Sequence, residues 1–161
     1  MRKIMVIFLL AAVAGTVLGV RYYLHTQRTQ QALEEKTVVQ ARLGDADFML
    51  EVADSDAERE QGLQNRTTLP LHHGMLFEFP RKQTTGFWMK NTFIPLDFLW
   101  IDGNRIVDIT ANVQSEPGVA DANLHVYYPN MPVNRVIEIY AGDVNRYHIQ
   151  VGDSVEIGNA E

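Results

Sequence analysis

The clearest pattern in the chain is an alternation of apolar and polar residues, interrupted by turn-forming residues, beyond residue 45. Phe48, Leu50 and Val52 share one face of residues 47–53, with the period of two that is typical of a half-buried strand. Further strands are expected at residues 75–79, 86–89, 96–101, 105–109, 136–140 and 154–157. Pro80 should end the second strand, and Asp102-Gly103-Asn104 predicts a hairpin turn.

Two short helical segments accompany these strands. Ser55 and Glu58 have the spacing of a capping box, and Gly62 is placed to close a helix of about two turns. Residues 142–148 predict a second short helix or a turn. The pattern therefore favours an α+β class: a compact β-rich domain, built as a curled sheet or small barrel with one or two short helices.

An N-terminal hydrophobic helix is expected to precede this domain. Residues 4–20 carry no charge, and they can cross a hydrocarbon core of about 30 Å if Arg21 extends its charge to the interface. Arg2 and Lys3 favour a cytoplasmic N-terminus. A cleaved signal peptide is the main alternative, because Ala12-Val13-Ala14 resembles a processing site, and a buried helix of the domain is a third reading.

These features divide the chain into three parts. Residues 1–24 form a transmembrane anchor or signal segment, residues 25–44 a polar stalk, and residues 45–158 the folded domain. The expected location is the inner (cytoplasmic) membrane, crossed once, with the domain in the periplasm. If the signal is cleaved, the domain is secreted to the periplasm instead. The membrane is then a partner through the N-terminal segment.

Composition and charge exclude several classes of protein. Net charge is −6 for the chain and −9 from Tyr22 onward, where eleven basic residues are scattered among twenty acids. No nucleic-acid partner is expected, because such partners require a basic stripe. The absence of cysteine excludes thiolate metal sites and a cysteine nucleophile. No Gly-rich phosphate loop occurs, and no cofactor is predicted.

The stretch at residues 86–101 holds the candidate ligand site. It contains only two charges, those of Lys90 and Asp97, in an apolar setting where a charge needs a partner. One interpretation is an ion pair between them across the turn at residues 91–95. The other is a pocket rim that combines Trp88, Lys90, Asn91 and Asp97 as an aromatic wall, a cation, an amide and a carboxylate.

Other polar and aromatic residues give weaker signals. Tyr128 lies in an aromatic loop, residues 127–132, and is a further candidate for contact with a ligand or partner. His72 and His73 are adjacent, so a strand would point them to opposite faces, and no metal site is predicted. No local motif assembles a Ser-His-Asp triad.

Several short motifs resemble the bacterial and archaeal family called domain of unknown function 192. The resemblance covers about residues 47–157 and is strongest in Phe87-Trp88-Met89-Lys90-Asn91-Thr92 followed by Ile94-Pro95-Leu96-Asp97. It extends to Gly62-Leu63, Arg66, Leu69-Pro70, Gly74-Met75-Leu76-Phe77, Phe79-Pro80 and Val151-Gly152-Asp153. The resemblance implies a small β-rich α+β domain, often exported or membrane-anchored. Residues 115–129 lack the cysteine pair of many relatives, so no cysteine-linked role is transferred.

Three functions remain open at this stage. The first is an envelope-facing module that binds a small molecule or a partner protein without catalysis. The second is an envelope-associated hydrolase or transferase that uses Lys90 and Asp97 in an aromatic-lined pocket. The third is a structural partner of a membrane protein complex, in which the loop at residues 127–132 and the stalk would matter more than Lys90.

Overall fold

The computed structural model describes residues 20–21 and 36–158. Most of the predicted anchor, residues 1–24, and most of the predicted stalk lie outside the described residues, so the hydrophobic helix stays a prediction. In the part of the chain that the structure describes, no helix combines the length and apolar character needed to cross a membrane. The domain itself is described from Lys36 onward.

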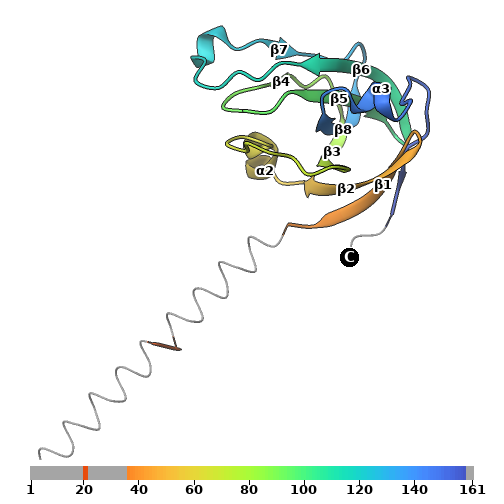
Figure 1. The fold of residues 1–161 in the computed structure, drawn as a ribbon, viewed down its shortest axis with the longest axis horizontal. Helices are drawn as coiled ribbons and strands as arrows, with labels where there is room; N and C mark the ends of the chain where they lie inside the picture. Colours follow the sequence, from red (N-terminus) through yellow and green to blue (C-terminus); the bar gives the residue numbers. More distant parts are fainter. Residues whose placement is uncertain (1–19, 22–35, 159–161) are drawn as a thin grey trace, which may run out of the picture. The chain divides into compact units, whose positions relative to one another are not determined.

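The domain consists of short strands with two short α-helices and one 3₁₀ turn (Figure 1). In chain order the elements are β1 (Val38–Leu43), β2 (Ala46–Ala53), α2 (Asp56–Gln61), β3 (His73–Gln83), β4 (Phe87–Trp88), β5 (Leu96–Asp102), β6 (Arg105–Val113), η1 (Asp121–Asn123), β7 (Val126–Tyr127), β8 (Val133–Tyr140), α3 (Asp143–Arg146) and β9 (Glu156–Ile157).

Seven strands form one sheet in the order β6-β5-β8-β3-β2-β1-β9, and β4 pairs with β7 in a separate two-stranded sheet. Every pair in the large sheet is antiparallel except β2 and β3, which are parallel because the chain crosses over through α2. The sheet curls strongly, so that β6 and the C-terminal segment approach each other (Figure 1). The prediction of a curled, β-rich sheet with short helices is confirmed for the described domain.

Residues 152–155 hold the two ends of the curled sheet together. They exchange backbone hydrogen bonds with the start of β6: Gly152 N–H donates to Ile106 (2.8 Å), Ile106 N–H to Asp153 (3.0 Å) and Val155 N–H to Asn104 (2.8 Å). The chain then continues into β9, which pairs with β1 at the opposite edge. These contacts make the sheet a half-barrel that is bridged at one end.

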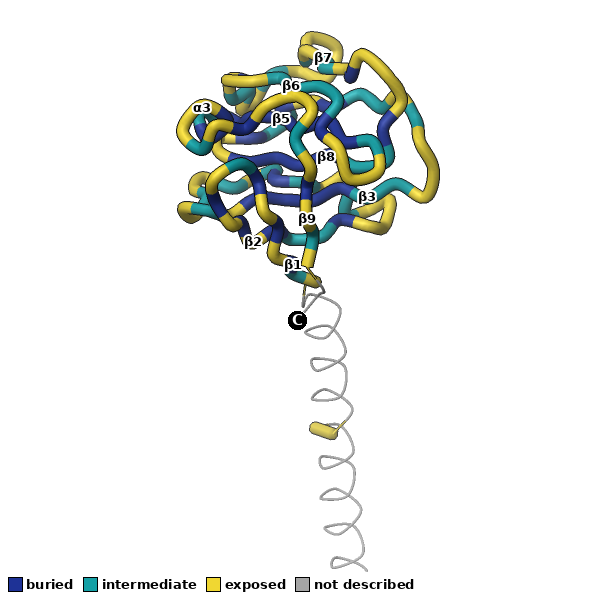
Figure 2. The backbone as a smooth tube through the Cα atoms, turned by 90° about the vertical axis from the view of Figure 1, so that its right-hand side faces the viewer, coloured by how far each residue is buried: buried dark blue, intermediate teal, exposed yellow. Residues whose placement is uncertain are grey.

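Buried residues run along most of β5 and β8 and the first half of β3 (Figure 2), so both faces of the sheet are covered there. One hydrophobic cluster fills the concave side around Phe48, Leu99 and Ile137. A second cluster, around Phe77, Phe98 and Trp100, lies between the other face and the β4–β7 pair. Burial on both faces explains why β5 is an almost continuous apolar run rather than an alternating one.

Several local predictions are confirmed. The Ser55 side chain accepts from the N–H of Glu58, and the Glu58 carboxylate accepts in return from the N–H of Ser55, so the capping box starts α2 as expected. The hairpin at residues 102–104 joins β5 to β6. Pro80 was expected to end β3, which instead runs to Gln83. It is tolerated because the pairing of β3 with β8 is interrupted between Glu78 and Gln83.

The predicted stalk at residues 25–44 is wrong for its last part. β1 lies there and pairs along its whole length with β2, so the domain begins before residue 45. Val39, Ala41 and Leu43 face the core, but a short strand with alanine at its centre gave only a weak pattern. β7 was also missed, because it is only two residues long.

We expect Gly44 to be essential to the β1–β2 hairpin. It has φ +53°, and a Cβ at this position would overlap the carbonyl oxygen of Tyr147. Gly44→Ala should therefore lower the free energy of unfolding by about 3 kcal/mol or more. Gly103→Ala is the control, because Gly103 has φ +62° with open space around it, and should cost only about 1 kcal/mol. Chemical denaturation followed by tryptophan fluorescence measures both, and equal losses would contradict the steric argument.

Candidate functional site

The structure separates the residues that the sequence suggested as one site. The Lys90 Nζ atom lies 2.7 Å from Asp121 Oδ2, at the surface, and not beside Asp97. Asn91 adopts a left-handed conformation (φ 49°), and its carbonyl oxygen accepts from the N–H of Asn65. Tyr128 is 59% exposed. The predicted Lys90–Asp97 ion pair is therefore not formed.

Asp97 is fully buried and serves the fold. Its carboxylate accepts three backbone hydrogen bonds, from Asn112 (2.7 Å), Gly142 (2.9 Å) and Val144 (3.0 Å). Gly142 and Val144 lie at the start of α3, which has no side-chain cap of its own, so Asp97 supplies that cap from another strand. Burial raises the pKa of the nearby Asp143 carboxyl despite the charge of Arg146.

The two histidines that the sequence places side by side have separate roles. His72 hydrogen-bonds through Nε2 to the hydroxyl of Tyr147 (2.8 Å) and packs against Phe48. His73 bonds through Nδ1 to the carbonyl oxygen of Leu71. Among the described residues, no group of three or more His, Asp or Glu side chains is arranged to hold a metal ion.

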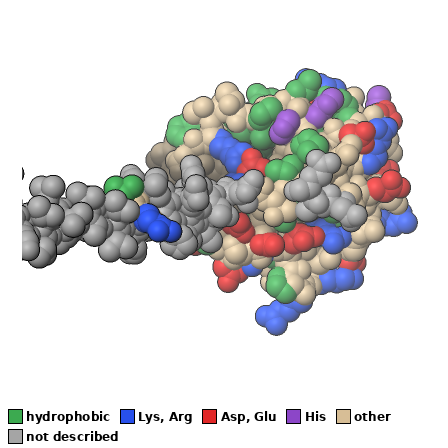
Figure 3. All heavy atoms as spheres, turned by 90° about the horizontal axis from the view of Figure 1, so that it is seen from below, with side chains coloured by type: hydrophobic (Ala, Val, Ile, Leu, Met, Phe, Trp, Pro, Cys, Tyr) green, Lys and Arg blue, Asp and Glu red, His purple; other side chains and the backbone are tan. Residues whose placement is uncertain are grey.

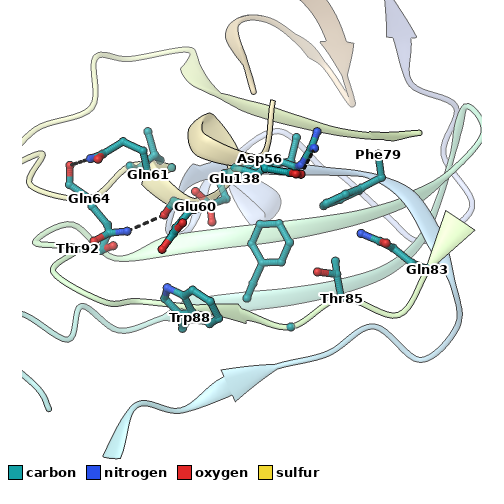
Figure 4. A pocket seen from close by; sticks show the side chains of 16 residues that line it. Asp56, Glu60, Gln61, Gln64, Phe79, Gln83, Thr85, Trp88, Thr92 and Glu138 are labelled. Atoms are coloured by element: carbon teal, nitrogen blue, oxygen red, sulfur yellow. Dashed lines mark hydrogen bonds and ion pairs between the residues drawn. The ribbon is translucent and has the colours of Figure 1, made fainter. Parts of the chain in front are cut away.

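Trp88 instead lines a pocket that the other candidates do not share. This cavity has a volume of about 360 Å³, within the range of small-molecule sites, and opens between α2, β3 and the segment that leads into β4 (Figure 4). It is lined by Asp56, Arg59, Glu60, Gln61, Gly62, Leu63, Gln64, Phe77, Phe79, Gln83, Thr85, Gly86, Phe87, Trp88, Thr92 and Glu138.

Aromatic rings form one side of this pocket. Phe87 meets Phe77 edge to face, with 4.9 Å between ring centroids, and Phe79 at 6.4 Å. Trp88 follows at the rim and is 42% exposed. The wall is fixed from behind, because Gly86 packs so closely on Val126 and Tyr128 that a Cβ there would collide with both.

Polar side chains of α2 and the following turn form the opposite side. Arg59 is held in place: its guanidinium donates to the carbonyl oxygens of Asp54 and Glu78 and to the Asp56 carboxylate, and it lies over the ring of Phe79. Glu60, Gln61 and Gln64 lie along the same rim (Figure 4). The positive charge of Arg59 is therefore already matched within the domain.

Glu138 lies at the base of the pocket, in the middle of β8. Its neighbours across the sheet are Met75 of β3 and Phe98 of β5, so the carboxyl sits in an otherwise apolar row. The residue is 5% exposed, and within residues 36–158 no side chain or backbone group hydrogen-bonds to its carboxyl. Burial raises the pKa of Glu138 to about 8, which keeps the carboxyl largely protonated at neutral pH.

The sequence signal for Glu138 was weak. Residues 136–140 predict a strand, but one acid among four apolar residues does not reveal whether its side chain faces water or the interior. β8 is a central strand covered on both faces, and the β4–β7 pair together with α2 encloses the space above it. That cover comes from residues distant in sequence, which periodicity does not reveal.

The chain belongs to the DUF192 family, described as Uncharacterized ACR. The family model matches residues 37–157, which is the whole described domain apart from its first and last residue. This agrees with the resemblance seen in the Phe87–Asp97 motifs. No curated protein matches the chain significantly.

Two crystal structures are similar to this domain. One is a protein from Sinorhizobium meliloti 1021, named provisionally as a transcription regulator, with 34% identity, a TM-score of 0.68, and coverage of 76% of this chain and 95% of that chain. The other is a protein of unknown function from Novosphingobium aromaticivorans DSM 12444, with 31% identity, a TM-score of 0.62, and coverage of 74% and 83% respectively.

The separate environments of Lys90 and Asp97 predict independent effects on stability. Asp97→Ala should lower the free energy of unfolding by about 3 to 5 kcal/mol, because three buried backbone donors lose their acceptor. Lys90→Ala removes only a surface ion pair and should cost less than about 1 kcal/mol. In thermal or chemical unfolding, the free energy of unfolding lost in the double variant should equal the sum of the losses in the two single variants. A clear coupling energy would contradict this.

The raised pKa of Glu138 predicts a pH-dependent stability difference. The unfolded carboxyl ionises near 4.5 and the folded one near 8, so ionisation favours the unfolded chain as pH rises through this window. Glu138→Gln should therefore be more stable than wild type by roughly 2 kcal/mol or more at pH 8. The difference should shrink steadily toward pH 4.5. Glu156→Gln, at an exposed position, is the control, and a pH-independent difference for Glu138→Gln would count against the assignment.

Proposed function

We propose that this domain binds a small molecule, without catalysis, in the pocket between α2 and β4. One observation carries the proposal: the buried carboxyl of Glu138, which has no partner among the described residues, opens into an aromatic-lined cavity of about 360 Å³. An unpaired buried polar group destabilises a fold, so its presence at the base of a cavity is better explained by a ligand than by structure. The pocket combines apolar walls with a few polar groups, as ligand sites commonly do.

The geometry gives less support to the hydrolase or transferase alternative. That hypothesis required Lys90 and Asp97 in one aromatic pocket, but neither lines the cavity, and both already have partners. For the partner-protein alternative, Tyr128 and Met131 are exposed in the loop at residues 127–132. No particular partner follows from that exposure.

DNA binding is disfavoured, although one structural neighbour carries a regulator's name. The chain beyond residue 21 has a net charge of −9, and on the face seen in Figure 3 acidic side chains lie among the basic ones. A DNA-binding surface needs concentrated positive charge to release counterions. The β4–β7 pair and the short helix α2 enclose the pocket, and they do not present a helix or ribbon for insertion into a DNA groove.

For location, we propose that the domain faces the periplasm from the inner membrane. The uncharged segment at residues 4–20, with Arg2 and Lys3 before it, supports a single-pass anchor with its N-terminus inside. Secretion after signal cleavage remains the alternative. The natural ligand would then be a small molecule of the envelope.

A fragment screen on the full chain tests the binding proposal. Trp88 lines the pocket, so occupancy should change tryptophan fluorescence, and binding should saturate. Trp88→Ala should weaken binding of a selected fragment by about tenfold or more, because a stacking surface is lost. Phe93→Ala is the matched control, since Phe93 is an exposed aromatic outside the pocket lining, and it should leave affinity unchanged. Saturable binding whose affinity is unchanged in Trp88→Ala, or no binding from a diverse library, would refute the proposal.

A further inference from the structure

We propose that the ligand is an organic cation that carries an ammonium group on a small hydrocarbon frame. The ammonium group lies beside the carboxylate of Glu138 and against the aromatic rings of the pocket. This inference rests on the proposed binding function and specifies its ligand class. It starts from Glu138, a residue that is 5% exposed and whose carboxyl faces the cavity (Figure 4). A buried carboxylate needs a positive charge or several donors close by.

The described domain does not supply that positive charge. Arg59 is the single basic residue in the pocket lining, and its guanidinium donates to the backbone carbonyl oxygens of Asp54 and Glu78 and to the Asp56 carboxylate. The flanking positions on β3 and β5 are Met75 and Phe98, which are neutral. The charge that satisfies Glu138 would therefore come from the ligand.

The rest of the lining suits a cation better than an anion. The faces of aromatic rings carry negative potential and attract ammonium groups, and the pocket offers the rings of Phe77, Phe79, Phe87 and Trp88. Asp56 is paired with Arg59, so the remaining ionisable side chains in the lining, Glu60 and Glu138, are both acids. An anionic ligand would meet like charge and no uncommitted basic side chain in this lining.

Binding should release a proton. The Glu138 carboxyl is mostly protonated at neutral pH, whereas a neighbouring cation stabilises its charged form. When the cation binds, the O–H bond of the carboxyl breaks, the electron pair stays on the carboxylate, and the proton passes to the buffer. Affinity for a permanent cation should therefore rise with pH up to about 8 and then level off.

The experiment compares choline with its neutral isostere 3,3-dimethylbutan-1-ol on the full chain at constant ionic strength. Choline keeps its charge at every pH, so any pH dependence comes from the protein. We expect choline to bind about tenfold or more tightly than the alcohol above pH 8, with the preference falling to about threefold or less near pH 6. Calorimetry in buffers of different ionisation enthalpy should show close to one proton released at pH 7.

Two variants complete the test. Glu138→Gln keeps the shape of the side chain, so it should reduce the preference for choline to about threefold or less at every pH and abolish the proton release. Glu156→Gln changes an exposed acid outside the pocket lining and should alter neither. The proton release is measured on the wild-type chain, so the proposal stays testable even if Glu138→Gln folds poorly.

The outcomes separate this inference from the binding proposal. If the alcohol binds as tightly as choline and both are lost in Trp88→Ala, the pocket binds small molecules but the cation inference is overturned. A preference for choline that stays at about tenfold in Glu138→Gln, or wild-type binding without proton release, also overturns it. If neither probe binds, the cation inference is overturned, while the fragment screen decides the binding proposal independently.

Discussion

The carboxylate of Asp97 holds together the parts of this domain that the curled sheet brings to one end. Its two oxygens accept from the end of β6, at Asn112, and from the turn into α3, at Gly142 and Val144. Asn112 (φ 58°) and Gly142 (φ 92°) adopt positive φ values, and both aim their N–H groups at the carboxylate. A helix of four residues cannot sustain itself, so α3 depends on this contact from β5.

Asp97 and Glu138 show two opposite outcomes of burying an acid in the same sheet. Both lie on central strands covered on both faces, Asp97 with the concave cluster and Glu138 with the cluster beneath β4 and β7. Three backbone N–H groups donate hydrogen bonds to the Asp97 carboxylate, whereas the Glu138 carboxyl has apolar side chains and an open cavity beside it. The first arrangement stabilises the fold, and the second lowers stability at neutral pH in a way that a binding function would explain.

The sequence predicted the features that depend on near neighbours. The capping box at Ser55 and the hairpin at residues 102–104 are local, and both were found correctly. The Lys90–Asp97 pair failed because closeness in sequence was taken as closeness in space. The turn through Asn91 carries Lys90 toward residues 116–121, while Asp97 enters β5 and points into the opposite cluster. Glu138 was missed for the converse reason, since the other residues that line its pocket lie 46 to 82 positions earlier in the chain.

The Phe87–Asp97 block therefore combines scaffold and pocket in a single motif. Phe87 and Trp88 face the cavity, Met89 and Ile94 are buried in the core beside it, and Asp97 fixes the far end of the sheet. The β4–β7 pair is only two residues long on each side, so its position depends on the close contact of Gly86 with Val126 and Tyr128. Because that contact sets where the aromatic wall stands above Glu138, the depth of the pocket is determined by packing outside it. A family motif at this position can thus reflect the shape of the cavity as much as any contact with a ligand.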